Sequence, residues 1–180
     1  MNRPLLILDL DETLVWAADD PAPSVFDFKA FKYFVTKRPH LNTFLDRAFE
    51  WFEVAVWTSS DDLYASRIVN QVFADVAQLQ FVWTRVKCTQ RYDEETRELY
   101  FLKDLKKVKR KGFDLCRVLI LDDSPEKAHR HYGNYIGVRS FEGQSNDQEL
   151  LDILPFLDWL KDRPDFRRVE KRNWRTQRFP

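Results

Sequence analysis

The sequence predicts an α/β fold in which a doubly wound parallel sheet carries a small β-hairpin insertion and no large cap domain. Two continuous apolar runs, at 5–8 and 118–121, have the length and composition of strands that are buried on both faces. Segments with the apolar spacing of helices alternate with the predicted strands, which is typical of a parallel sheet covered by helices on both sides.

The first half of the chain is expected to form a strand, a flap, a helix and a second strand. After the strand at 5–8, residues 17–24 are rich in alanine, aspartate and proline and are expected to form a loop. Aromatic residues at near-alternate positions of 25–36 predict a small hairpin or flap. Pro39 suits the first turn of the next helix, and the apolar segment 52–57 is expected to be the second strand.

The second half of the chain is expected to add a helix, the insertion and two further strands. Ser60 is a suitable N-cap for the helix after the second strand, and Tyr64 lies on the apolar face of that helix. Residues 75–100 are expected to hold the inserted hairpin, because two β-prone runs there flank a polar centre. The run at 118–121 predicts a third strong strand, and 135–139 predicts a weaker fourth.

A single domain, residues 1–162, followed by a basic tail, residues 163–180, is expected for a chain of 180 residues. The tail has seven basic and two acidic residues, which gives it a local net charge of +5. Two interpretations of the tail stay open: a disordered end, or a charged segment that attracts an acidic ligand to the domain.

Composition excludes several classes of protein. The chain has 29 basic and 29 acidic residues, so it lacks the excess positive charge of a general polyanion binder, and nucleic acid is not an expected partner. Cys88 and Cys116 are too few for a disulfide scaffold and have no metal-ligand spacing. The apolar runs are too short to span a membrane. We therefore expect a monomer in the cytoplasm, or in the nucleus if the source is a eukaryote.

Acidic and hydroxyl side chains follow each of the three strongest predicted strands. Asp9 and Asp11 come after the first strand, Thr58–Ser59 after the second, and Asp122 with Asp123 after the third. The carboxyl ends of parallel strands meet at one edge of the sheet, where ligands bind in open α/β folds. Carboxylates that converge there repel one another unless a cation relieves them, and a set of oxygen ligands suits Mg²⁺.

Lys103 follows the predicted hairpin and is able to bring a positive charge to the same edge. A site with Mg²⁺, a lysine, a threonine hydroxyl and backbone amides is chemically suited to a phosphate group. Among the carboxylates, one is able to attack phosphorus while another moves the proton.

Four segments in the same order resemble the motifs of the haloacid dehalogenase (HAD) superfamily of aspartate-nucleophile phosphatases. The segment Asp-Leu-Asp-Glu-Thr-Leu-Val at 9–15 resembles its first motif, and Val-Trp-Thr-Ser-Ser at 56–60 resembles its second. Lys103 resembles the third motif, and Leu-Asp-Asp-Ser-Pro at 121–125 the fourth. The resemblance extends from about Leu5 to Leu160, and it implies the Rossmann-like HAD fold.

Three further segments are similar to one family within that superfamily. Lys-Arg-Pro-His at 37–40, Lys-Asp-Leu at 103–105 and Leu-Ile-Leu-Asp-Asp-Ser-Pro at 119–125 resemble the small C-terminal-domain phosphatases, the NLI-interacting-factor-like family. The resemblance implies a Mg²⁺-dependent protein phosphatase whose partner is a phosphorylated protein or peptide carrying phosphoserine or phosphothreonine.

The same resemblance implies roles for the candidate site residues. Asp9 is expected to attack phosphorus and form an aspartyl-phosphate. Asp11 is expected to protonate the leaving oxygen and then to deprotonate the hydrolytic water. Thr58, Ser59, Lys103 and Thr13 are expected to bind the phosphate.

The metal ligands implied by the resemblance are Asp9, the backbone carbonyl of Asp11, and an acid of the fourth motif. Asp123 is the implied ligand of that pair and Asp122 the partner of Lys103, although the sequence leaves open which of the two binds the metal directly. The family often has asparagine in place of Asp123, so this chain carries an additional negative charge there.

Two alternative functions remain at this stage. The segments 17–36 and 75–100 do not match the family closely, so a small phosphorylated metabolite or a nucleic-acid end is an alternative substrate. The second alternative is a catalytically silent module that binds phosphopeptides. Absence of a large cap favours an open site that is reached by macromolecules.

Overall fold

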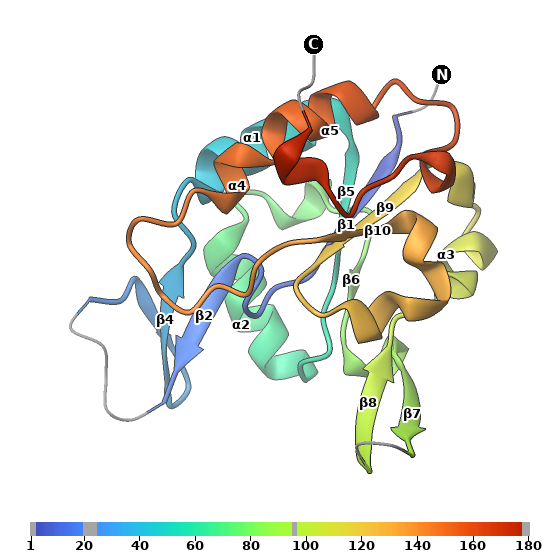
Figure 1. Cartoon of the computed structure of the whole chain (residues 1–180). Coiled ribbons are helices and arrows are strands. Elements are labelled where there is room, and N and C mark those ends of the chain that lie inside the picture. The colour runs from blue at the N-terminus through green and yellow to red at the C-terminus, as the bar shows by residue number, and fades with distance from the viewer. Residues whose placement is uncertain (1–2, 20–24, 95–96, 178–180) are drawn as a thin grey trace.

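The computed structural model describes residues 3–19, 25–94 and 97–177, and its centre is a five-stranded parallel sheet (Figure 1). The strand order is β10-β9-β1-β5-β6. The strands of this sheet are β1 (Leu5–Leu8), β5 (Glu53–Trp57), β6 (Val82–Trp83), β9 (Val118–Asp122) and β10 (Tyr135–Gly137). The predicted α/β fold with a parallel sheet is confirmed.

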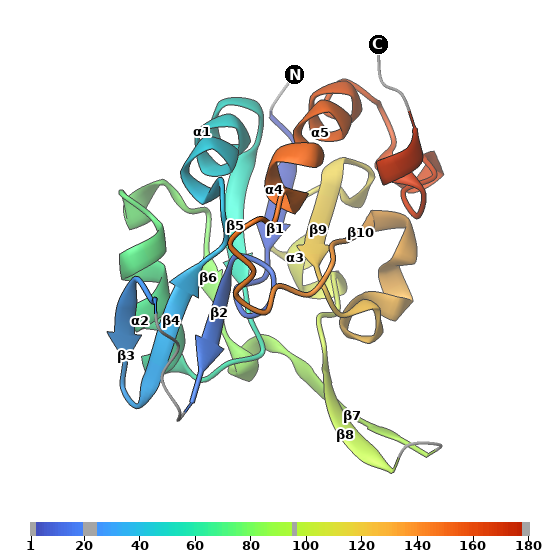
Figure 2. The same ribbon diagram turned by 60° about the vertical axis from the view of Figure 1, so that its left-hand side comes forward.

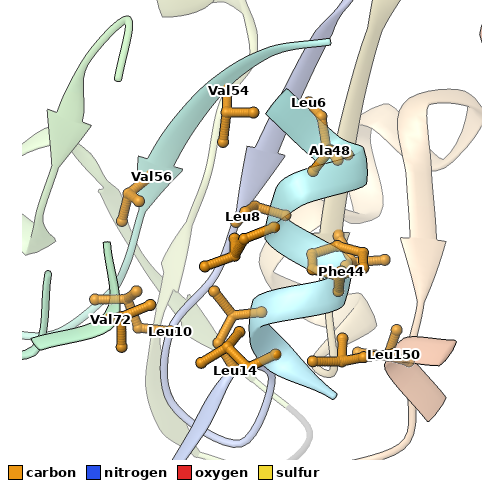
Figure 3. Close-up of a cluster of buried hydrophobic side chains, with 14 of the residues drawn as sticks. Leu6, Leu8, Leu10, Leu14, Phe44, Ala48, Val54, Val56, Val72 and Leu150 are labelled. Atoms are coloured by element: carbon orange, nitrogen blue, oxygen red, sulfur yellow. The ribbon is translucent and has the colours of Figure 1, made fainter. Parts of the chain in front are cut away.

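Successive residues of a strand point to opposite faces of the sheet, and here the residues on both faces are apolar. Helices therefore cover both faces. Leu6 and Leu8 pack into one cluster, and Leu5 and Ile7 pack into a second one. Figure 3 shows the first cluster, in which Leu6 lies beside Ala48 and Leu8 faces Phe44. The helices that bury residues in this cluster are α1 (Leu41–Trp51), α2 (Asp62–Val72), α4 (Glu149–Asp152) and α5 (Leu154–Leu160). On the opposite face lie α3 (Lys106–Arg110) and a 3₁₀ segment, Pro125–Asn134.

A small antiparallel sheet follows β1, and the hairpin predicted at 25–36 forms part of it. Its strand order is β2-β4-β3, with β2 (Val15–Ala18), β3 (Phe28–Ala30) and β4 (Tyr33–Lys37). The expected loop at 17–24 was therefore wrong at residues 17 and 18, which pair with β4. The remainder of that loop includes 20–24, which lie outside the described residues.

The inserted hairpin consists of β7 (Thr89–Asp93) and β8 (Glu98–Leu102) and projects from the body of the molecule (Figure 2). It begins later than the expected insertion at 75–100, because Val82 and Trp83 pair with β5 at the edge of the main sheet. The small sheet and the hairpin both lie toward the carboxyl ends of the main strands, so they frame that edge (Figures 1 and 2).

The segment 163–177, which the sequence suggested to be a separate basic tail, packs against the domain. Phe166 and Trp174 are buried in the first cluster of the core. The Trp174 indole Nε1 donates a hydrogen bond to the Gly137 carbonyl at 3.0 Å. Because two large aromatic side chains leave water here, the described part of this segment is folded, and the interpretation as a disordered end does not apply to it.

Candidate active site

Asp9 lies directly after β1, in the middle of the sheet, and Lys103 connects it to Asp122. Since β1 and β9 pair with Leu8 opposite Leu121, the residues that follow them are neighbours. The Lys103 Nζ lies 2.8 Å from Asp9 Oδ1 and 2.5 Å from Asp122 Oδ2. All three charged side chains are buried. The structure therefore brings together three site residues that come from the first, third and fourth motifs.

The two carboxyl groups beside Lys103 differ in acidity. Burial opposes ionisation of Asp9, but the positive charges of Lys103 and Lys127 and the hydrogen bonds to Asp9 together outweigh it and lower the pKa of Asp9 below its usual value. Burial and the charge of Asp9 raise the pKa of Asp122. Asp9 is thus the carboxylate that stays ionised, which is the state that a nucleophile needs.

Asp11 has a separate environment, formed by the start of α2. The Ser60 hydroxyl donates to Asp11 Oδ2 at 2.6 Å, and the Tyr64 hydroxyl donates to Asp11 Oδ1 at 2.6 Å. Burial raises the pKa of Asp11, although these two hydrogen bonds oppose the increase. A carboxyl group with a raised pKa retains its proton more readily, so Asp11 is suited to be a general acid.

The contacts of Asp11 include two residues whose roles the sequence interpretation missed. Ser60 was expected to cap α2, but the cap is Asp61, whose side chain accepts from the backbone N–H groups of Leu63 and Tyr64. Tyr64 was assigned to the apolar face of the helix, where its ring does lie. The sequence carries no local signal for this pair, because Ser60 precedes the helix and Tyr64 fits the apolar face of the helix.

We expect Tyr64→Phe to shift the basic limb of the pH profile of kcat/KM to higher pH. The variant loses a hydrogen bond that favours the ionised form of Asp11, so its pKa rises and the acid stays protonated to higher pH. The loss of kcat/KM at neutral pH should be at most about tenfold, since the acid itself remains. Steady-state kinetics between pH 5 and 9 measure the shift; Tyr132→Phe, at an exposed tyrosine, is the control. An unchanged basic limb would contradict this role.

Thr13 connects the first and fourth motifs and is itself held by a buried arginine. Its Oγ1 accepts a hydrogen bond from the Asp123 backbone N–H at 3.2 Å, and its carbonyl accepts one from Arg38 Nη1 at 3.0 Å. Arg38 is fixed by two hydrogen bonds of 2.8 Å to Asp147. The preceding residue, Glu12, has a φ of 55°, a left-handed conformation that gives the turn its tight shape. These contacts set the position of Asp123 relative to the turn at Asp9–Asp11.

Thr58 and Ser59 lie at the carboxyl end of β5, beside β1 in the sheet. The buried Thr58 hydroxyl accepts a hydrogen bond from the Ser60 backbone N–H at 3.0 Å. Such a hydroxyl is still able to donate its own proton. The Ser59 carbonyl accepts from Arg85 Nε at 2.7 Å. The structure thus places both residues at the expected edge, next to the residues that contact Asp11.

Three carboxylates form a cluster that fits a divalent cation. In the described part of the chain, Asp9, Asp122 and Asp123 each offer an oxygen, and these oxygens lie within 4.8 Å of one another. Asp11 is not in this cluster through its side chain, which points to Ser60 and Tyr64 instead. A set of carboxylate oxygens is the donor set that Mg²⁺ prefers, so the residues present fit the ion that the sequence suggests.

Lys127 is a further charged residue at this cluster and was not among the predicted site residues. Its Nζ lies 3.2 Å from Asp9 Oδ2, and its backbone carbonyl accepts the Lys103 N–H at 2.7 Å. Nearby carboxylates, Asp9 foremost, raise the pKa of Lys127 although burial opposes this. Its only signal in the sequence is the spacing of four residues from Asp123.

An open groove of about 540 Å³ begins at Asp11 and extends over the small sheet. One wall comes from the start of α2 and combines polar side chains with the exposed Leu63, and the other is formed by the turn between β3 and β4. Its lining includes Asp11, Phe31, Tyr33, Ser60, Tyr64 and Arg85. The ring of Phe31 is largely exposed, at 66%. The groove therefore offers apolar and charged contacts beside the residue that is suited to be the general acid.

No helix in the described ranges combines the length and the apolar character that crossing a bilayer would require.

The chain is similar to several known phosphatases. A profile of the NLI interacting factor-like phosphatases matches residues 4–167. The CTD nuclear envelope phosphatase 1B of Danio rerio is 33% identical, over 99% of this chain and 76% of the relative. The human carboxy-terminal domain RNA polymerase II polypeptide A small phosphatase 1 is 35% identical, over 88% of this chain and 60% of the relative.

Solved structures of similar fold include two of the RNA polymerase II CTD phosphatase Fcp1. One has a TM-score of 0.60 and 18% identity, and covers 94% of this chain and 46% of the solved chain. The other, a fission yeast variant bound to beryllium fluoride, has a TM-score of 0.58 and 18% identity, and covers 87% of this chain and 50% of the solved chain. The chain thus spans about half the length of these solved proteins, and the likeness shows a shared fold.

Proposed function

The chain belongs to the NLI interacting factor-like phosphatase family, and we propose that it removes phosphate from phosphoserine or phosphothreonine in proteins, with Mg²⁺ as cofactor, through an aspartyl-phosphate. The observation that carries this proposal is the pair of carboxyl groups with opposite acidity. Asp9 is kept ionised by Lys103 together with Lys127, whereas the pKa of Asp11 is raised by burial. One nucleophile and one acid are what the reaction needs.

In the first step, an oxygen of Asp9 forms a bond to phosphorus and the bond from phosphorus to the serine or threonine oxygen breaks. The leaving oxygen takes the proton of Asp11, whose carboxyl group is oriented by Ser60 and Tyr64. In the second step, Asp11 takes a proton from water, and the water oxygen replaces Asp9 at phosphorus. Both steps move negative charge onto the phosphoryl oxygens, where Lys103 and the Thr58 hydroxyl are proposed to bind.

The proposed metal ligands are Asp9 and Asp123, with the backbone carbonyl of Asp11. Asp122 belongs to the same cluster, but its contact of 2.5 Å with Lys103 favours the role of a lysine partner. When bound, Mg²⁺ would supply positive charge that offsets the developing charge on phosphate.

Removal of divalent metal should reduce turnover of an aryl phosphate by at least about 100-fold, because several kcal/mol of charge stabilisation are lost. The measurement is hydrolysis by the purified protein with Mg²⁺, with EDTA, and with EDTA followed by excess Mg²⁺. Recovery on adding Mg²⁺ separates metal loss from damage to the protein. Equal rates with and without metal would exclude Mg²⁺ as the cofactor.

A protein substrate is supported by the groove beside Asp11, which is open and is formed partly by the small sheet. The human relative is named for the carboxy-terminal domain of RNA polymerase II, a protein substrate class. We propose that residues next to the phosphoserine contact Phe31, because this side chain presents a largely exposed ring to the groove.

Phe31→Asn should raise KM for a phosphoserine peptide by about 10- to 100-fold, because burial of a phenylalanine ring is worth about 1.5–3 kcal/mol. Phe31 has a φ of 56°, and asparagine accepts this conformation best among residues with a Cβ, so the turn is retained. Steady-state kinetics give KM of the variant and of the wild type for the peptide and for an aryl phosphate. KM for the aryl phosphate should not change, and Val86→Asn, at an exposed valine outside the groove, is the control. A parallel change for both substrates would favour a small-molecule substrate.

The cellular location and the oligomeric state of the protein are also proposals. The Danio and Xenopus relatives are named for the nuclear envelope, so the nuclear alternative has support that a plain cytoplasmic location lacks. We propose a monomer that is free of the membrane, which sedimentation equilibrium and flotation with vesicles would test.

A further inference from the structure

One side chain, Lys127, contacts all three carboxylates of the proposed metal cluster. Its Nζ lies 3.2 Å from Asp9 Oδ2, 3.7 Å from Asp122 Oδ1 and 4.0 Å from Asp123 Oδ1. The three acids are the same ones whose oxygens lie within 4.8 Å of one another. The ammonium group therefore lies against the atoms that a divalent cation would contact.

We propose that Lys127 is a built-in counter-cation of this cluster, and that a divalent metal ion binds there only when the ammonium group moves out. The inference rests on the proposed function for the identity of the metal. Beyond that function, we infer that the Lys127 ammonium group of this chain competes with the metal ion for the three carboxylates.

Charge and distance explain why the two cations exclude each other. Mg²⁺ binds oxygen at about 2.0–2.1 Å and demands near-ideal octahedral geometry. An ammonium group that contacts the same three carboxylates would lie within a few ångströms of the ion, where two positive charges repel strongly in a half-buried site. Without metal, the ammonium group relieves the repulsion among the three acids.

The contacts of Lys127 also identify the part that moves. Its backbone is fixed, because its carbonyl accepts the Lys103 N–H at 2.7 Å and its own N–H donates to the Ser124 carbonyl at 3.2 Å. The side chain is 16% exposed, whereas that of Lys103 is fully buried. A long side chain at the protein surface is able to swing into water without a change in the fold. Lys127 therefore leaves the cluster, and Lys103 remains.

Chemical labelling of amines in the wild-type protein tests the displacement directly. Acetic anhydride reacts with free amines, and mass spectrometry gives the acetylated fraction of each lysine. We expect saturating Mg²⁺ to increase the labelling rate of Lys127 severalfold and to leave the rate of exposed Lys109 unchanged. Labelling of Lys127 that stays the same or falls on adding Mg²⁺ would overturn the proposal.

A second measurement uses Lys127→Met and the matched control Lys109→Met, each titrated with Mg²⁺ while the thermal unfolding midpoint is followed. We expect the metal-free Lys127→Met protein to unfold at a lower temperature and to bind Mg²⁺ about tenfold more tightly than the control. Equal affinities in the two variants would overturn this inference alone. No binding in either variant or in the wild type would overturn it together with the Mg²⁺ part of the proposed function. If Lys127→Met does not fold, Lys127→Gln takes its place, and the labelling result stands without either variant.

Discussion

Asp9→Asn is expected to lower kcat for an aryl phosphate and for a phosphoserine peptide by about 10⁴-fold or more. Removing the nucleophile of a covalent mechanism leaves only binding and charge stabilisation, which accounts for losses of this size. The amide of asparagine is close in shape to the carboxylate and is a far weaker nucleophile. The measurement is steady-state hydrolysis of both substrates at saturating concentration.

The fold of Asp9→Asn should persist, because Lys103 keeps its contact of 2.5 Å with Asp122. Circular dichroism and the thermal midpoint check this. Asp46→Asn, at an exposed residue of α1, is the control for loss of one negative charge. If Asp9→Asn retained more than about 1% of wild-type kcat, covalent catalysis by Asp9 would be excluded.

Lys103→Met is expected to destabilise the protein by about 3–5 kcal/mol and to reduce kcat/KM by about 10²–10³-fold. The stability loss follows because two buried carboxylates, Asp9 and Asp122, lose the positive charge between them. The activity loss follows because a positive charge near the phosphoryl oxygens is removed. Urea denaturation and steady-state kinetics measure the two effects.

The destabilisation by Lys103→Met should also depend on pH. Without the lysine, the folded-state pKa values of Asp9 and Asp122 rise, whereas the unfolded values stay near the ordinary 3.8. The folded variant then binds more protons than the unfolded chain above that pH, so its stability falls as pH increases from 5 toward 8. Denaturation at pH 5 and pH 8 should give the smaller deficit, relative to wild type, at pH 5. A deficit that is independent of pH would show that lost packing, not charge, explains the effect.

The central part of the fold could be predicted from the sequence because its signals are local. The continuous apolar run at β1 is long enough for a buried strand and ends abruptly at Asp9. The run at β9 ends in the same way, at Asp122 and Asp123. Parallel pairing then requires that these strand ends meet. The contacts of Asp9 and Asp122 with Lys103 agree with this pairing.

The residues that the sequence did not reveal depend on contacts between distant elements. Tyr64 fits the apolar face of α2, and nothing in that pattern shows that its hydroxyl reaches Asp11. Lys127 is one of many lysines, and its position depends on a 3₁₀ segment that has no regular apolar period.

The packing of the C-terminal segment, residues 163–177, also depends on contacts between distant elements and was therefore not predicted. Phe166 and Trp174 are far apart within a segment whose composition is basic, so its charge hid the two anchors that hold it to the core. The β2 strand was also missed in part, because it becomes regular only through its pairing with β4.

The most direct test of the account is to trap the phosphorylated enzyme during turnover. Asp11→Asn should slow hydrolysis of the intermediate, because the base for the attacking water is lost. Acid quenching of this variant with an aryl phosphate, whose leaving oxygen needs no proton from Asp11, and then reduction with borohydride converts an aspartyl-phosphate to homoserine. We expect mass spectrometry to find homoserine at position 9, and only when substrate is present. A protein that turns over substrate and shows an unmodified Asp9, or a modified residue elsewhere, would contradict it.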